Sequence, residues 1–326
     1  MRFIYYGSVL QELISIRPVC EILPGNSNLA FYVSPPMPFS GLAKTFADSH
    51  YVVIGVPYDV TSSYRSGSRF GPAALREASL NIETYSLRSE TDLEEIGIAD
   101  MGDIHVVSDP GEMVERIRLV VTDVVRAGKV PILLGGEHLI TLGAIKALSN
   151  DVAVIDFDAH LDLRETYMGE EYSHATFMRK VAEIVSPKNI FYVGIRAVSK
   201  DELEFSRERG LTFVDARGVR NVKSDELAQN LRSRLAGFSK IYLTVDADVL
   251  DPAYAPAVGN PEADGLSPDD VLTLISGICD ERVVGMDLVE IAPHYDTGIT
   301  STLGARIIFE AICAIEKSRK HVSKHF

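Results

Sequence analysis

The sequence is poor in cysteine and in positive charge, and it contains no long apolar run. Its three cysteines, Cys20, Cys279 and Cys313, are far apart and form no CxxC motif, so neither a disulfide framework nor a cysteine zinc site is predicted. We expect them to be free, buried thiols in a reducing compartment. No segment reaches the roughly 18 apolar residues of a membrane-spanning helix. The first 20 residues lack the apolar core of a signal peptide, so we predict a cytoplasmic protein.

Lysine and arginine number 32 against 46 aspartates and glutamates, which gives a formal net charge of -14. Nucleic acids and anionic membranes bind surfaces on which Lys and Arg cluster, so neither is expected to be the main partner. A cationic small molecule would be attracted. The hydrophobic content of 46% is that of an ordinary globular protein that can bury a sizeable core.

Short apolar runs alternate with segments of helical periodicity along most of the chain. Strands are predicted at 51–56, 95–100, 130–135, 152–157, 189–195, 211–216, 240–246 and 282–289. Helices are predicted at 71–85, 110–127, 139–149, 173–185, 200–209, 222–236, 267–278 and 299–318, the seventh with Ser267 as N-cap and Pro268 as first helical residue. This alternation predicts a three-layer α/β/α fold with a mainly parallel, eight-stranded sheet. We expect a single domain over 41–326, preceded by an N-terminal arm over 1–40 in which prolines gather near the end.

The stretch "AVIDFDAHLDLRE" places Asp156, Asp158, His160 and Asp162 at every second position after an apolar run. In an extended segment, residues two apart share a face and lie about 6.6 Å apart. Carboxylates held that close repel one another, so a positive charge or shifted pKa values must offset the cost of burying them. Ligands of parallel α/β sheets bind at the carboxyl ends of the strands, where this stretch is expected.

Three further strands end in acidic or imidazole side chains. These are Glu137 and His138 after one strand, Asp246, Asp248 and Asp251 after another, and Asp287 with Glu290 on the last. Carboxylates and imidazoles without thiolates suit a hard or borderline divalent ion, and manganese tolerates this mixture best. The candidate ligands are six in number: His138, Asp158, His160, Asp162, Asp246 and Asp248. Six ligands are too many for one tetrahedral zinc ion. Two ions sharing carboxylates fit the number, and such a pair activates water as a nucleophile near neutral pH.

Several segments resemble the successive motifs of the ureohydrolase family, which comprises arginases, agmatinases and formiminoglutamases. They are "GGEHLIT", "DFDAHLDLR", "SHATFMRK", "LTVDADVLDPAYAPAVGNPEADGLS" and "MDLVEIAPHYDTGITSTLGAR", and "TSSYRSGSRFGPAALREAS" resembles a segment found particularly in agmatinases. The resemblance covers about residues 50 to 310. It implies an arginase-like fold and two Mn²⁺ per subunit. One ion would be bound by His138, Asp158, Asp162 and Asp246, and the other by Asp158, His160, Asp246 and Asp248.

The same resemblance implies a mechanism. A hydroxide bridging the two ions would attack the guanidinium carbon, and the tetrahedral intermediate would collapse to urea and an amine. Asp162 would pass a proton to the leaving nitrogen, Glu290 would hold the guanidinium group, and His174 would relay protons at the mouth of the site. A guanidinium is a poor electrophile, so a carboxylate that orients it and a proton donor for the departing amine make chemical sense.

The loop after the DAHLD segment carries Glu165, Glu170 and Glu171, which would repel a substrate carboxylate and attract an amine. We therefore expect agmatine to be the substrate and putrescine, a polyamine precursor, the product. Aminopropylagmatine, guanidinobutyrate and arginine are the alternatives within the family. The resemblance also implies a homo-oligomer, either a trimer or a hexamer.

Two hypotheses outside this chemistry are a two-metal phosphoesterase and a non-catalytic metal-binding or polyamine-binding regulator. For Asp156 we expect a structural role beside the ligands, for Asp251 a turn cap, and for Arg65 and Arg69 loop ion pairs. Leu139 stands where family members often have Ser, which puts one supporting hydrogen bond in doubt but not the ligand His138.

Overall fold

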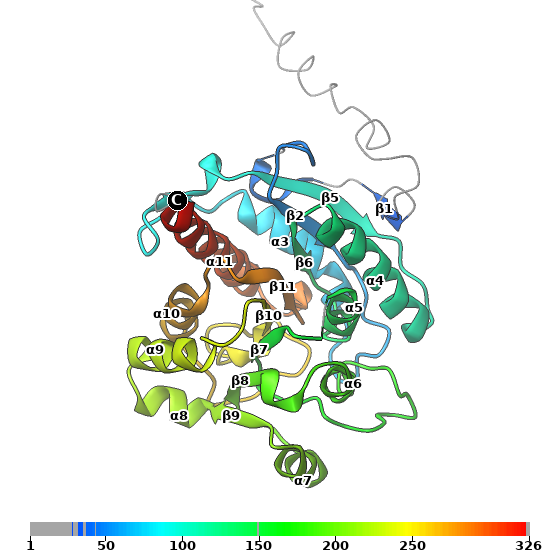
Figure 1. Ribbon diagram of the computed structural model, residues 1–326. Helices are drawn as coiled ribbons and strands as arrows, with labels where there is room; N and C mark the ends of the chain where they lie inside the picture. The colour runs from blue at the N-terminus through cyan, green and yellow to red at the C-terminus, as the bar shows by residue number, and fades with distance from the viewer. Residues whose placement is uncertain (1–27, 29–31, 35–36, 43, 149, 324–326) are drawn as a thin grey trace, which may run out of the picture.

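The computed structural model describes residues 28, 32–34, 37–42, 44–148 and 150–323. Nine strands form one sheet in the order β1-β5-β2-β6-β11-β10-β7-β8-β9 (Figure 1). All neighbouring pairs are parallel except β1 with β5. The bounds are β1 Val33–Ser34, β2 Tyr51–Gly55, β5 Ile98–Ile104, β6 Val130–Leu134, β7 Ala153–Phe157, β8 Ile190–Ile195, β9 Thr212–Asp215, β10 Ile241–Asp246 and β11 Val283–Val289. The eight predicted parallel strands are confirmed, and the short antiparallel β1 is added at one edge.

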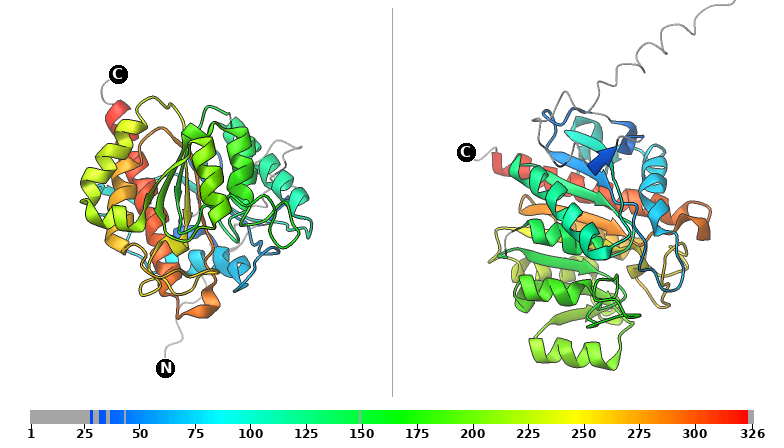
Figure 2. Two further views of the ribbon diagram at one scale, coloured as in Figure 1. Left: turned by 90° about the horizontal axis from the view of Figure 1, so that it is seen from below. Right: turned by 90° about the vertical axis from the view of Figure 1, so that its right-hand side faces the viewer.

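Helices cover both faces of the sheet, as the left view of Figure 2 shows. One face packs against α4 (Pro110–Arg126), α5 (Ile140–Ala147) and α6 (Phe177–Ile184). The other packs against α3 (Gly71–Ser79), α8 (Ala216–Asn221), α9 (Ser224–Arg234), α10 (Pro268–Ile278) and α11 (Ile299–Ser323). Because both faces are covered, the central strands are buried at every residue, which explains why their sequences are apolar without alternation. The helix α7 (Lys200–Arg209) lies beside the β8–β9 edge (Figure 1).

The helices differ from the prediction in four places, one of which is the end of α11, which continues five residues past the predicted 318. The segment predicted as one helix over 222–236 is preceded by a separate helix, α8, which begins where Asp215 accepts a hydrogen bond from the Gly218 amide. The helix predicted at 71–85 ends at Ser79, before the hairpin of β3 (Tyr85–Ser86) and β4 (Thr91–Asp92). The helix predicted from 173 begins only at 177, because the Thr176 hydroxyl binds the backbone of neighbouring residues and holds them in turns.

Other predictions are confirmed. Ser267 caps α10 by accepting from the Asp270 amide, and Pro268 is the first helical residue. Cys279 and Cys313 are buried and free. Among the described residues, no helix has both the length and the apolar character needed to cross a membrane. Cys20 and most of the proposed arm over 1–40 lie outside the described residues.

Candidate metal centre

The four strands predicted to end in acidic or imidazole side chains, β6, β11, β10 and β7, are neighbours at the centre of the sheet. In the parallel register Val245 of β10 lies beside Phe157 of β7, so Asp246 and Asp158 follow at the same edge. The chain places carboxylates from different strands together because the carboxyl ends of parallel strands meet at one edge.

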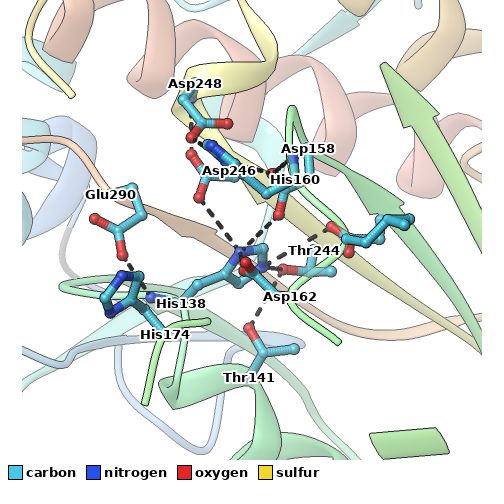
Figure 3. Close-up of polar contacts among 12 residues, drawn as sticks. His138, Thr141, Asp158, His160, Asp162, His174, Thr244, Asp246, Asp248 and Glu290 are labelled. Atoms are coloured by element: carbon cyan, nitrogen blue, oxygen red, sulfur yellow. Dashed lines mark hydrogen bonds and ion pairs between the residues drawn. The ribbon is translucent and has the colours of Figure 1, made fainter. Parts of the chain in front are cut away.

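Two groups of potential ligand atoms form there, and they share Asp158 (Figure 3). In the first group, Nδ1 of His138 lies 3.1 Å from Oδ2 of Asp158 and 3.3 Å from Oδ2 of Asp246. In the second, Nδ1 of His160 lies 3.0 Å from Oδ2 of Asp248 and 3.5 Å from Oδ1 of Asp158. Each group gathers its ligand atoms within 4.8 Å of one another.

Asp162 completes the six side chains named from the sequence. Its Oδ2 lies 3.6 Å from Nδ1 of His138, so it belongs beside the first group. Its backbone adopts φ 49°, in the left-handed region, and Glu290 at the end of β11 adopts φ 64°. Non-glycine residues in this region carry a conformational cost that often marks a functional site. The structure thus brings all six residues and Glu290 to one edge of the sheet.

Several buried polar atoms of this centre have no hydrogen-bond partner among the described residues: Nδ1 of His138, Oδ2 of Asp158 and both carboxylate oxygens of Asp156. Leaving such atoms unpaired away from water is costly. Divalent ions would satisfy the lone pairs of His138 and Asp158 and offset the repulsion among the carboxylates. Among the described residues that line the adjoining cavity, Arg164 is the only arginine, and none is a lysine. The donor set therefore fits a pair of oxygen- and nitrogen-ligated dications.

In this cluster, burial and neighbouring charges often shift the pKa of a group in opposite directions. Burial and the carboxylates of Asp248 and Asp158 raise the pKa of Asp246 well above its ordinary value. Burial alone would raise the pKa of Asp158 too, but contacts with both imidazoles hold it below its ordinary value. Burial alone would lower the pKa of His138, yet the neighbouring carboxylates of Asp158 and Asp246 raise it well above the usual range. Protons and metal ions compete for the same lone pairs, so metal binding must release protons.

A network of hydroxyl groups around Asp287 supports the His138 ring on the side away from the carboxylate ligands. Its Nε2 lies 2.8 Å from the hydroxyl of Thr244, which donates to Asp287; Thr141 and Tyr242 also donate to that carboxylate. Neither Thr244 nor this role of Asp287 was predicted. A signal was present, however: Thr244 precedes Asp246 by two positions and therefore shares its face of β10.

His174 is held by a second polar chain. The buried carboxylate of Glu137 accepts from both the amide and the hydroxyl of Thr61, each at 2.8 Å. The Thr61 oxygen lies 3.3 Å from Nδ1 of His174, and the Ser63 hydroxyl lies 3.3 Å from Nε2. With the Thr61 hydrogen committed to Glu137, Nδ1 carries the imidazole hydrogen, and the Nε2 lone pair faces Ser63. Burial, followed by the charges of His160 and His138, lowers the pKa of His174 to about 4.

Glu290 joins the two parts of the site. Its Oε1 accepts from the His138 amide at 2.9 Å, and the side chain lines the cavity together with His174 (Figure 3). Burial and the neighbouring Glu137 raise the pKa of Glu290 to about 8. A side chain at Gly259 would approach Oε2 to 2.9 Å, so glycine there leaves room for the carboxylate.

The cavity has a volume of about 280 Å³ and opens over the second ligand group. Besides the residues already described, its walls include Arg164, Tyr167, Glu202, Asn260 and Glu262. The loop acids Glu165, Glu170 and Glu171 are exposed and do not line this cavity. The sequence identified the acidic character of the surroundings but missed Glu262, which lies about 100 residues further along the chain.

Other residues named from the sequence have structural roles. Asp251 accepts from the amides of Ala253 and Gly265, so the turn prediction is confirmed. Arg69 pairs with Asp59, as expected. Arg65 differs from the prediction: its guanidinium donates to the Pro256 carbonyl and lies over the rings of Tyr64 and Tyr295. Leu139 is buried in the apolar core and has no side-chain donor for the site.

The sequence and fold match known proteins over most of their length. The family model described as the arginase family matches residues 49–314. An agmatinase from Bacillus anthracis is 41% identical over 258 residues, covering 77% of this chain and 87% of the relative. An N(1)-aminopropylagmatine ureohydrolase from Thermococcus kodakarensis is 38% identical, with 82% of this chain and 92% of the relative covered.

A solved structure agrees with these matches. The agmatine ureohydrolase of Thermoplasma volcanium superposes with a TM-score of 0.83 at 38% identity, covering 88% of this chain and 97% of that one. The matched range contains all six candidate ligands as well as His174 and Glu290. This protein belongs to the arginase family and is a hydrolase that acts on guanidino groups.

Proposed function

We propose that this protein is a binuclear manganese amidinohydrolase that converts agmatine and water to urea and putrescine. The observation that carries the proposal is the pair of ligand groups sharing Asp158, with Glu290 facing the same cavity. The residues that would hold one ion are His138, Asp158, Asp162 and Asp246, and those for the other are Asp158, His160, Asp246 and Asp248. Two such ions supply Lewis acidity that makes water a nucleophile near neutral pH.

The chain's own residues bind the substrate and move its protons. The positive charge of the bound guanidinium favours the ionised form of Glu290. Its carboxylate, fixed by the His138 amide, pairs with the guanidinium group and orients its carbon toward the metal ligands. Addition of water to that carbon, followed by cleavage of the bond to the alkyl nitrogen, gives urea. Asp162 delivers a proton to the departing amine. His174, neutral because of its lowered pKa, passes protons between Nε2 and the cavity mouth.

Agmatine is favoured over arginine and guanidinobutyrate because the cavity walls are acidic and their one arginine is already paired. Arg164 lies 3.8 Å from Glu202 and its guanidinium lies over the Tyr167 ring. A substrate carboxylate would therefore find no unpaired cation among the described lining residues. Membership of a family of guanidino hydrolases removes the phosphoesterase hypothesis.

Aminopropylagmatine is the second candidate. A neighbouring cavity of about 240 Å³ shares Arg164, Ser199 and Glu202 with the walls of the first. A longer polyamine tail could extend toward it. The relative from Thermococcus kodakarensis carries this substrate in its name.

The test is urea release from agmatine, aminopropylagmatine, guanidinobutyrate and arginine by the purified, manganese-loaded protein. We expect the highest kcat/KM for agmatine. Preferential turnover of arginine or guanidinobutyrate would overturn the substrate assignment, and agmatine binding without urea from any substrate would support the regulator hypothesis. The proposal also includes a cytoplasmic location and a homo-oligomer. Light scattering on the purified protein measures its molar mass and so tests the assembly.

A further inference from the structure

Glu262 is a carboxylate in the cavity wall that has no lysine or arginine partner among the described residues. No described lysine or arginine side chain lies within ion-pair distance of it, and its nearest ionisable contact is the imidazole of the candidate ligand His160, whose Nε2 lies 3.9 Å from Oε1. The side chain is 46% exposed, which places it at the mouth of the cavity. A negative charge positioned there is available to a cationic ligand.

The other acids of the cavity are already committed. Glu202 accepts from the amides of Leu163 and Ser199 and pairs with Arg164. Asp162, Asp246 and Asp248 belong to or adjoin the ligand groups, and Glu290 is assigned to the guanidinium. The loop acids predicted to attract an amine are exposed, so water and salt screen their charge, and Glu165 lies 3.9 Å from the guanidinium of Arg179.

The loop that carries Glu262 is fixed to the metal centre. Arg196 donates to the Glu262 carbonyl at 2.8 Å and to the Asp248 carbonyl at 2.6 Å, so one guanidinium ties both loops together. Three residues before Glu262, Gly259 lies directly against the Glu290 carboxylate. The same short loop therefore borders the guanidinium site at one end and the cavity mouth at the other.

We propose that Glu262 binds the terminal ammonium of the substrate and so selects guanidines that carry an amine at the far end. This inference deepens the proposed function and rests on it for the position of the guanidinium. A charge-assisted hydrogen bond from an ammonium to Glu262 stabilises a diamine-like substrate. Arginine would bring its carboxylate to the same place and be repelled.

The experiment compares two ligands and three variants of the manganese-loaded protein. Agmatine and n-butylguanidine share the guanidinium and the four-carbon chain, but only agmatine has the ammonium. The variants are Glu262→Gln, Glu262→Asp and a matched control, Asp264→Asn. Asp264 lies on the same loop, pairs with Arg220 outside the cavity and has φ 68°, which asparagine tolerates. KM, kcat, calorimetric affinity and bound manganese are measured for each.

We expect Glu262→Gln to weaken agmatine binding and raise its KM about 10- to 100-fold, as for loss of one charged hydrogen bond. Its kcat, its manganese content and its handling of n-butylguanidine should stay close to wild type, and Glu262→Asp should recover part of the affinity. Asp264→Asn should match wild type for both ligands.

Three outcomes would overturn the inference. The first is that the wild-type protein binds agmatine no better than n-butylguanidine. The second is that Glu262→Gln loses affinity equally for both ligands and also loses manganese. The third is that Asp264→Asn weakens agmatine binding as much as Glu262→Gln does. The second would make Glu262 a residue that acts through His160. If agmatine binds in a Glu262-dependent way but yields no urea, the inference stands and the proposed function fails.

Discussion

The Nε2 atom of His138 lies 2.8 Å from the hydroxyl of Thr244, which itself donates to Asp287 at 2.5 Å. Because the only hydroxyl hydrogen is committed to Asp287, the imidazole must carry its own hydrogen on Nε2. The lone pair is then on Nδ1, the atom that faces Asp158 and Asp246. Metal-binding histidines are commonly oriented in this way by a partner on the other nitrogen.

Thr244→Val should therefore weaken manganese binding without unfolding the protein. Valine keeps the shape and removes the acceptor for Nε2, so we expect about 10- to 100-fold lower affinity for the ion held by His138. Titration of metal-free protein with manganese in a calorimeter measures it. Thr122→Val on α4, where the hydroxyl donates to a helix carbonyl, is the control. Unchanged affinity in Thr244→Val would show that the hydroxyl does not set the tautomer.

Thr61→Val should slow catalysis while leaving the metal centre intact. It removes the hydroxyl through which Glu137 holds His174, so the imidazole is no longer fixed with its Nε2 lone pair toward the cavity. We expect kcat for agmatine to fall about 100-fold, within the range of general acid–base contributions, with little change in KM. Thr61→Ser retains the hydroxyl and should keep most of the activity. Equal kcat values for Thr61→Val and Thr61→Ser would show that the Thr61 hydroxyl does not orient His174 for catalysis.

Asp158→Asn should abolish metal binding and activity together, because Asp158 belongs to both ligand groups. In wild-type protein, manganese in excess should raise Tm by about 5 to 10 °C over chelator-treated protein, since a ligand that binds only the folded state stabilises it. The variant should show no such shift. Scanning calorimetry with and without manganese measures both, and full activity in a variant with two metals bound would contradict the assignment.

The parallel strands and the six candidate ligands were predictable because both depend on local patterns. The runs at 130–135, 152–157, 240–246 and 282–289 end in side chains of one chemistry, and parallel strands bring such ends to one edge whatever their order. Strand order itself did not need to be known. The confirmed N-cap at Ser267 likewise depends only on its immediate neighbours.

The residues that support the site were harder to predict because they act across long sequence separations. Thr61 contacts His174, although 113 positions separate them in the sequence. Glu262, in the loop after β10, lies beside His160, which follows β7. A threonine or glutamate in a loop has no pattern that names its distant partner. The charge of the acidic loop around Glu170 was visible in the sequence, but the exposed position of that loop outside the main cavity was not.

Arg76→Met should destabilise the fold strongly. Arg76 is 1% exposed and donates twice to Asp100 and once to Asp103. Methionine fills similar space but leaves the buried Asp100 carboxylate without its counter-charge, which costs about 3–5 kcal/mol of unfolding free energy. Urea denaturation measures the loss. The exposed pair of Arg88 with Asp269 is the control, and Arg88→Met should cost less than about 1 kcal/mol. Equal losses would show that burial does not decide the effect.

His50 should make the stability of the fold depend on pH. Burial, followed by the charges of Arg319 and Lys129, lowers the pKa of this half-buried imidazole from 6.5 to about 4. The unfolded chain therefore binds more protons than the folded chain between these two values. The contribution is fully present above pH 6.5 and is lost as the pH falls toward 4. A pKa unit is worth about 1.4 kcal/mol, and partial exposure reduces the expected loss to about 1–2 kcal/mol.

His50→Gln removes this titration and should flatten the dependence. Unfolding free energies from urea titrations at a series of pH values are compared for the variant and wild type, because contributions from other groups, including the carboxylate cluster, cancel in the difference. The difference should change by about 1–2 kcal/mol between pH 7 and pH 4.5 in favour of the variant. His321→Gln, at an exposed position near the end of α11, is the control for the substitution itself. Parallel curves for His50→Gln and wild type would mean that protonation of His50 is tolerated in the folded state, against the effect of its two cationic neighbours.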